Sequence, residues 1–150
     1  MRRLQQVTPQ VAADVVAIQQ VLYQYAYALD ARDYDALDEV FDPDASLHTS
    51  GGTLMSPAEY KAMCATELAK LDATHHMVTN TSVSVDGDRA SARAYFQAQH
   101  VKRSLAPDSQ FLMAGWVDDE FERRAEGWRI VDRRWHSAWS SGNPAVLGMF

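Results

Sequence analysis

The sequence predicts an α+β fold, organised as a single domain over residues 1–150. In the first half of the chain, apolar residues recur at the helical spacing of three and four. In the second half, apolar and polar residues alternate with the period of two that is typical of strands. Helices followed by strands favour a layer of helices beside an antiparallel sheet. The sequence contains neither an internal repeat nor a linker-like segment that would divide it.

The first half of the chain predicts helices. Thr8 is a suitable N-cap and Pro9 fits the first helical position, so a long helix is expected over 9–31. The segment DYDALDEVF, residues 33–41, predicts a short second helix. One continuous apolar stripe marks the long helix: Val11, Val15, Ile18, Leu22, Tyr25 and Leu29.

A turn and a short strand are expected before the third helix. The letters DPDA, residues 42–45, predict the turn, and SLHTS, residues 46–50, predict a strand that ends at two glycines. Ser56 and Glu59 have the spacing of a capping box, which opens a third helix with Pro57 at its first position. This helix is expected to reach about residue 71.

The second half predicts four strands. The first covers 75–85 and joins the second, 89–103, through the hairpin turn DGD. Two more strands are expected over 109–124 and 128–140, joined at AEG. The second strand carries mostly small side chains on one face: Ala90, Ala92, Ala94, Phe96, Ala98 and His100. These small residues allow either close packing of a helix or a cavity with His100 at its rim, and both can hold at different ends of a curved sheet.

Composition excludes several classes of function. The formal net charge of −6 argues against a nucleic-acid partner, because an acidic surface repels phosphates. No stretch approaches the ~20 apolar residues of a membrane span, and the N-terminus lacks the apolar core of a secretory signal. The single cysteine, Cys64, fits a reducing compartment, so a cytoplasmic location is expected. The apolar C-terminal segment SGNPAVLGMF is expected to cover a pocket or a neighbouring subunit, which favours a homo-oligomer, either a dimer or a trimer.

A few polar residues stand out as candidates for chemistry. Asp30 lies at the C-terminal end of the first helix, where the helix dipole disfavours a carboxylate, although a solvated position is an ordinary alternative. Tyr25 lies within the apolar stripe, so it is either a core residue or a buried hydroxyl that needs a partner. His75 and His76 are neighbours in a strand and therefore face opposite sides of the sheet. Alternation alone leaves open which of the two faces inward.

Metals and cofactors are not expected. The histidines do not have the fixed spacing of a ligand motif, and the chain has no glycine-rich phosphate loop and no nucleophile elbow. The four histidines that could in principle be metal ligands are His48, His76, His100 and His136.

Three segments carry a family resemblance: AIQQVLYQYAYALDARDYDALDEVFDPDA, HHMVTN and DEFERRAEGWRIVDRRW. Their order resembles the SnoaL-like branch of the nuclear-transport-factor-like fold, and the similarity covers about residues 9–147. The resemblance implies a cone-like curved sheet, mixed or antiparallel, with the three helices of the N-terminal half on its concave face. Because this superfamily includes both enzymes and non-catalytic subunits, the fold alone does not define an activity.

Within the superfamily, the chain is most similar to scytalone dehydratase, bile acid 7α-dehydratase and hexachlorocyclohexane dehydrochlorinase. These enzymes share an Asp–His pair, which the resemblance assigns to Asp30 and to His76 in the pattern H-x-x-x-N, completed by Asn80. Tyr25 stands where the bile acid enzyme has a tyrosine, whereas the dehydrochlorinase has a lysine there. Arg133 matches a catalytic arginine after the GW turn. The resemblance therefore places His76 inward and His75 outward.

The residues expected to bind the substrate include one departure from the dehydratases. Where those enzymes have a second tyrosine on the first strand, this chain has His48 or Thr49. The predicted substrate contacts are His48, Thr49, Asn80, Phe96 and His100.

The predicted function is that of a small lyase of the dehydratase type, or an isomerase, acting on a hydrophobic alicyclic or aromatic molecule. Histidine suits the role of base because its ordinary pKa is near neutrality, and a carboxylate can fix its tautomer. The alternative is a non-catalytic ligand-binding domain or a structural subunit of the same fold.

Overall fold

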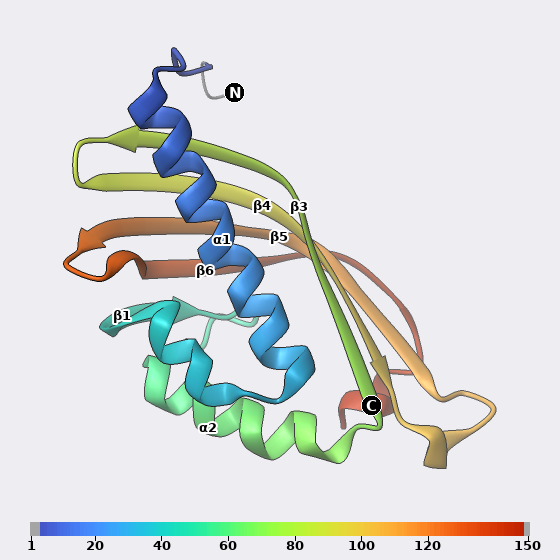
Figure 1. Cartoon of the computed structure of the whole chain (residues 1–150). Helices are drawn as coiled ribbons and strands as arrows, with labels where there is room; N and C mark the ends of the chain where they lie inside the picture. The colour runs from blue at the N-terminus through green and yellow to red at the C-terminus, as the bar shows by residue number, and fades with distance from the viewer. Residues whose placement is uncertain (1–3, 149–150) are drawn as a thin grey trace.

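Six strands form one mixed sheet in the computed structural model, which describes residues 4–148 (Figure 1). The strand order is β2-β1-β6-β5-β4-β3. Only β1 and β6 pair in parallel, and the other neighbours are antiparallel. The bounds are β1 Phe41–His48, β2 Leu54–Met55, β3 Ala73–Asp86, β4 Arg89–Val101, β5 Gln110–Arg124 and β6 Gly127–Gly142.

The helices of the first half lie over one face of this curved sheet, as predicted (Figure 1). They are α1 (Pro9–Ala31), the short 3-10 helix η1 (Tyr34–Glu39) and α2 (Pro57–Glu67). The expected caps are present. Thr8 Oγ1 accepts a hydrogen bond from the backbone N–H of Val11 at 3.2 Å, and Ser56 and Glu59 form the reciprocal capping box that opens α2.

Three predicted boundaries were wrong. The second helix ends at Glu39 rather than residue 41, and the DPDA segment belongs to β1 instead of forming a separate turn. In β1, Phe41 pairs with Ile130 and Ser46 pairs with Asp132, with a register shift between the two pairs. The DPDA residues occupy this irregular part, where Pro43 has no N–H to give to a ladder. The DPDA sequence favours a turn, but pairing with β6, which is distant in sequence, holds it in an extended strand. The third helix gives way after Glu67 to the 3-10 turn η2, Leu68–Lys70.

The small-residue face of β4 packs closely against a helix at one end and lines a cavity at the other, so both alternatives that its sequence allowed are present. Ala90, Ala92 and Ala94 are buried in the main core beside apolar residues of α1, because small side chains let the helix approach the sheet closely. Further along the same strand, Ala98 and His100 line a cavity. The change from packed core to cavity occurs within one strand as the sheet curves away from the helices (Figure 1).

A bulge interrupts β3. The pairing advances from Thr79 with Tyr95 to Ser82 with Arg93, so one extra residue enters β3. Asn80 lies in the bulge with a φ of 51°, a left-handed conformation that asparagine tolerates better than most residues. The extra residue moves the alternation by one position, so Asn80 is exposed and does not share the inward face of His76.

The C-terminal segment folds back toward the sheet. The 3-10 turn η4, Pro144–Leu147, buries Val146 against Leu71 and Phe111, and Leu147 lines the cavity. The expectation that this segment covers the pocket is therefore met at Leu147. The last two residues of the predicted tail lie outside the described part of the chain.

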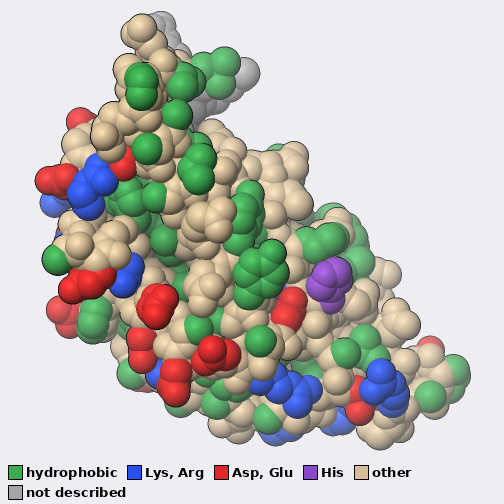
Figure 2. All heavy atoms as spheres, in the orientation of Figure 1, with side chains coloured by type: hydrophobic (Ala, Val, Ile, Leu, Met, Phe, Trp, Pro, Cys, Tyr) green, Lys and Arg blue, Asp and Glu red, His purple; other side chains and the backbone are tan. Residues whose placement is uncertain are grey.

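The surface over the helices is acidic in part. Figure 2 shows acidic side chains gathered over η1, an element whose Asp35 and Asp38 are both well exposed. No helix within residues 4–148 combines the length and the apolar character needed to cross a membrane.

Candidate active site

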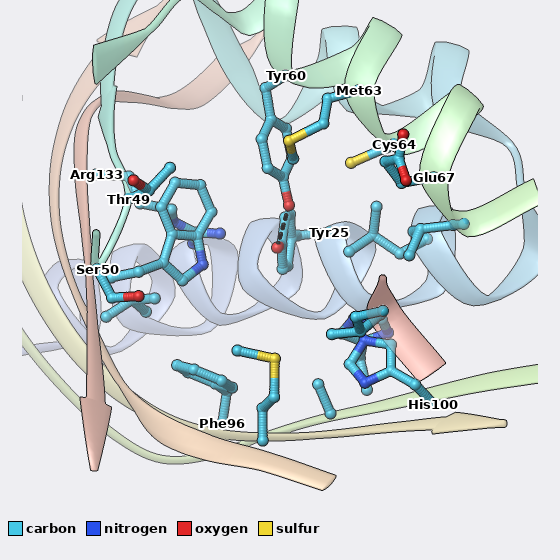
Figure 3. A pocket seen from close by; sticks show the side chains of 18 of the residues that line it. Tyr25, Thr49, Ser50, Tyr60, Met63, Cys64, Glu67, Phe96, His100 and Arg133 are labelled. Carbon is cyan, nitrogen blue, oxygen red and sulfur yellow. Dashed lines mark hydrogen bonds between the residues drawn. The ribbon is translucent and has the colours of Figure 1, made fainter. Parts of the chain in front are cut away.

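A cavity of about 330 Å³ lies between α1, α2 and the concave face of the sheet (Figure 3). Most of its wall is apolar, and a small number of polar side chains project into it. A largely apolar pocket with a few convergent polar groups is the usual form of a small-molecule site. Its apolar lining includes Leu29, Met63, Val78, Phe96, Ala98, Met113, Val117 and Leu147.

Asp30 and His76 are in hydrogen-bond contact, as predicted. The distance between Asp30 Oδ1 and His76 Nδ1 is 2.7 Å. The carboxylate also accepts the backbone N–H of His76 at 2.8 Å and the hydroxyl of Thr74 at 2.9 Å. His76 lines the cavity, and within residues 4–148 its Nε2 has no hydrogen bond. With Nδ1–H donated to Asp30, a neutral His76 presents a bare Nε2.

The environment of Asp30 favours its ionised form. Burial raises the pKa of this carboxyl, but the hydrogen bonds from the side chain and backbone of His76 outweigh burial and hold the pKa below its ordinary value. Helix α1 remains regular to Ala31, so no unwinding brings Asp30 to the cavity wall. Asp30 therefore stands behind His76, where it can orient the imidazole without touching a ligand.

Tyr25 faces the cavity, and its hydroxyl has a partner that the sequence did not indicate. Tyr25 and Tyr60 are both buried, and their hydroxyl oxygens are 2.6 Å apart (Figure 3). Burial raises the pKa of Tyr25 to about 12 and raises that of Tyr60 well above its ordinary value. Both side chains are therefore protonated near neutral pH, and they can donate hydrogen bonds but cannot act as bases.

Arg133 lines the cavity as part of a buried ion pair. Its Nε and Nη2 each donate to Asp119 at 2.7 Å, and both side chains are almost completely buried. The guanidinium lies 4.4 Å from the centre of the Tyr25 ring. The remaining nitrogen, Nη1, is buried without a hydrogen-bond partner among the described residues. Nη1 is therefore the guanidinium nitrogen that is not engaged by Asp119.

Two other predicted contacts, His100 and Phe96, line the cavity. The His100 ring meets the His76 ring edge to face, with centroids 5.8 Å apart, and its Nδ1 lies 3.3 Å from the carbonyl oxygen of Phe111. Burial, together with a smaller effect of the neighbouring His76, lowers the pKa of His100 to about 4. His100 is therefore neutral near pH 7.

Of the two candidates for the missing tyrosine, only Thr49 lines the cavity. His48 follows the buried Leu47, so it points to the opposite face of the sheet, where its Nε2 lies 3.1 Å from Asp132. Asn80 does not line the cavity either, because of the bulge in β3. Of the predicted substrate contacts, His48 and Asn80 therefore lie outside the wall of this cavity.

Several lining residues were missed by the sequence analysis. Tyr60, Cys64 and Glu67 follow one another at spacings of four and three on α2, and Trp135 lies two residues after Arg133 on β6. These spacings place each set on one face of its element. The pattern could have identified them, but the same pattern is normally that of a packed core. Residues 4–148 contain no group of three or more His, Cys, Asp or Glu residues arranged to hold a metal ion.

Fold and site together define an α+β cone protein with a largely apolar cavity enclosed between its helices and its sheet. Residues 10–134 match the model of the SnoaL-like domain, and the chain belongs to that family. An uncharacterized protein of Mycobacterium tuberculosis, Rv2910c, is 39% identical over 125 residues, which make up 81% of this chain and 83% of the relative.

Solved structures support the same fold. A candidate aromatic ring hydroxylase from Novosphingobium aromaticivorans is 28% identical with a TM-score of 0.80, over 95% of this chain and 99% of the other. A candidate scytalone dehydratase from the same species is 17% identical with a TM-score of 0.82, over 91% and 92%. The type 3 hexachlorocyclohexane dehydrochlorinase of Novosphingobium barchaimii is 18% identical with a TM-score of 0.75, over 89% and 92%. The resemblance to the SnoaL-like family is therefore confirmed, and the likeness to the dehydratase and dehydrochlorinase structures is one of fold.

Proposed function

We propose that this protein is a small-molecule lyase of the dehydratase type, or an isomerase, in which His76 removes a proton from carbon. One observation carries the proposal. Asp30 holds His76 Nδ1 at 2.7 Å, while the same imidazole lines an apolar cavity with no hydrogen bond to Nε2 within residues 4–148. This is the arrangement of a general base with its orienting carboxylate.

The proposed reaction starts from the neutral imidazole. His76 Nε2 takes a proton from the substrate carbon, and the Asp30 carboxylate stabilises the imidazolium that forms. In an elimination, the electron pair of the broken C–H bond forms a C=C bond and expels a group from the next carbon. A departing hydroxide takes the proton back from His76 and leaves as water. In an isomerisation, His76 returns the proton to a different carbon of the same molecule.

Two further side chains are proposed to stabilise negative charge. Tyr25 can donate its hydroxyl proton to a substrate oxygen, and Arg133 Nη1 is a buried donor in need of an acceptor. Such donors accelerate a reaction when they bind the transition state more tightly than the ground state. The buried Asp119 balances the charge of Arg133, so the donor acts without an unpaired cation in the cavity wall.

The same fold could also serve as a ligand-binding domain without chemistry. A cavity filled by side chains, or a fully solvated Asp30, would have favoured that alternative. Instead the cavity is open, and the Asp30 side chain is only 22% exposed. Likeness to a candidate scytalone dehydratase and to a dehydrochlorinase supports elimination chemistry, although it establishes only the fold.

Hydrogen–deuterium exchange tests the proposal without knowledge of the natural substrate. The purified protein is mixed in D₂O with hydroxylated and ketonic bicyclic probes, among them 1-tetralone and 1-tetralol, and NMR follows the protons next to the functional group. We expect faster exchange at the carbon beside the tetralone carbonyl, or dehydration of the alcohol. Binding of these probes with neither reaction would indicate the non-catalytic alternative.

A further inference from the structure

Asp30 is anchored to the edge of the sheet as well as to the imidazole of His76. Strand β3 is an edge strand and packs beside α1 (Figure 1), so the N–H groups on its free side have no partner strand. One of them, the backbone N–H of His76, donates to Asp30 Oδ2 at 2.8 Å. The hydroxyl of Thr74, two residues earlier and on the same face of β3, donates to Asp30 Oδ1 at 2.9 Å. The carboxylate that orients His76 is therefore itself oriented by β3.

Thr74 supplies the one hydrogen bond to Asp30 within residues 4–148 that does not come from His76. Asp30 Oδ1 accepts the Thr74 hydroxyl and lies 2.7 Å from His76 Nδ1, so the hydroxyl acts on the same oxygen that meets the ring. Because threonine is branched at Cβ, it has few side-chain rotamers, and the direction of its hydroxyl is closely fixed. Without this hydroxyl, the carboxylate would be held only by the residue that it has to orient.

The same hydroxyl helps to keep Asp30 ionised. Burial raises the pKa of this carboxyl, hydrogen bonds from the side chain and backbone of His76 lower it, and the hydrogen bond from Thr74 adds to their effect. The resulting pKa lies below its ordinary value, so the carboxylate is charged when His76 takes up a proton. An Asp30 oxygen that faced a methyl group in place of the hydroxyl would be desolvated without a compensating hydrogen bond.

Thr74 acts on the cavity only through other residues. The lining of the cavity includes His76 but neither Thr74 nor Asp30. An influence of the Thr74 hydroxyl on a bound molecule therefore passes through Asp30 and His76. A substitution at Thr74 can change the base without changing the fit of the ligand.

We infer that Thr74 is a positioning residue whose hydroxyl fixes the Asp30 carboxylate on β3 and thereby holds neutral His76 with its proton on Nδ1 and its bare Nε2 toward the cavity. The inference rests on the proposed function, because it concerns the base of that reaction. If Thr74 only completed the hydrogen bonding of a strand edge, loss of its hydroxyl would change stability and leave the base as it is.

Thr74→Val removes the hydroxyl and keeps the shape of the side chain. We expect the exchange rate in D₂O at saturating 1-tetralone to fall about tenfold, as loss of one hydrogen bond to a charged group would give. The dissociation constant for tetralone, measured by titration calorimetry, should stay at its native value. Thr74→Ser restores the hydroxyl and should recover most of the native rate. A native rate in folded Thr74→Val would overturn the inference.

Thr79→Val is the matched control. Thr79 lies on the same strand, but it is exposed on the face opposite the cavity. The same substitution there should change neither the exchange rate nor the affinity for tetralone, and melting temperatures check that each variant is folded. If Thr74→Val does not fold, Thr74→Ala also removes the hydroxyl without placing a branched apolar group against the carboxylate, and the same loss of rate is expected.

Nitrogen-15 NMR of labelled histidine tests the inference without turnover. At about pH 8.5, above the ordinary histidine pKa of about 6.5, the shifts of the two ring nitrogens show which of them carries the proton. The His76 signals are assigned by their absence from His76→Ala. The native protein and Thr74→Ser should show the proton on Nδ1, whereas Thr74→Val should show a mixture of both tautomers.

Failure of this inference can be told apart from failure of the proposed function. A single Nδ1–H tautomer in folded Thr74→Val would overturn the role of Thr74, even where the native protein catalyses exchange. A mixture of tautomers in Thr74→Val, together with a native protein that catalyses no exchange, would support the role of Thr74 and contradict the proposed function alone.

Discussion

His100 should make the protein less stable as the pH falls from 7 to 5. Its side chain is 5% exposed, and its ring meets the ring of His76. Burial and, to a smaller extent, the neighbouring His76 lower the pKa of His100 to about 4. The unfolded chain, in contrast, binds a proton at the ordinary histidine pKa of about 6.5.

The sign of the effect follows from these two values. Between pH 6.5 and pH 4 the unfolded state binds more protons than the folded state, so stability falls as the pH is lowered. The contribution of His100 is fully present above pH 6.5 and is lost progressively toward pH 4. A pKa of about 4 in the folded state corresponds to a loss of about 2 kcal/mol of unfolding free energy between pH 7 and pH 5.

Urea unfolding at pH 7 and pH 5 measures this loss in the native protein and in His100→Gln. Glutamine keeps a donor for the Phe111 carbonyl but cannot take up a proton. The native protein should lose about 2 kcal/mol more than the variant over this pH interval. His75→Gln, on the exposed face of β3, is the control and should behave like the native protein. An equal loss in the native protein and in His100→Gln would refute the argument that His100 is buried in its neutral form.

Three other substitutions have definite expected outcomes. Asp30→Asn should slow exchange of tetralone protons at least ~10²-fold, because the amide cannot stabilise the imidazolium of His76. NMR in D₂O measures the rate. An unchanged rate would remove Asp30 from the mechanism. Asp119→Asn should lower the unfolding free energy measured in urea by about 3 kcal/mol, because it leaves the buried Arg133 charge uncompensated. A change below about 0.5 kcal/mol would show that the Asp119–Arg133 ion pair does not contribute to stability. At the bulge, Asn80→Val should cost about 1–2 kcal/mol in the same assay whereas Asn80→Gly should cost little, because valine resists a positive φ. Equal costs for the two would contradict a backbone role, and exchange should be unaffected in both.

Local periodicity was enough to predict the main elements of the fold. The stripe of α1, the capping box of α2 and the alternation in β4 each indicate their element within a few residues. The segment over β1 could not be predicted in this way. Its residues favour a turn, and only pairing with a strand 80 to 90 positions later makes them extended. Such long-range pairing leaves no local periodic signal.

The site was predictable only in part, and for a similar reason. Alternation separates His75 from His76, and the resemblance indicated that His76 faces inward. The same alternation failed at Asn80, because a bulge inserts a residue that the sequence does not announce. Tyr60 was missed because an apolar stripe on a helix looks the same whether it lines a cavity or a packed core. Only the structure shows that its hydroxyl meets that of Tyr25.

The paired variants His75→Ala and His76→Ala test the central claim, that His76 is the base, most directly. The two residues are neighbours on β3, but His75 is exposed while His76 lines the cavity. The measurement is the exchange rate of tetralone protons in D₂O, with the melting temperature of each variant as a check on folding. His75→Ala should keep most of the native rate, whereas His76→Ala should lose at least ~10²-fold. Equal rates in the two folded variants would contradict the assignment of His76 as the base.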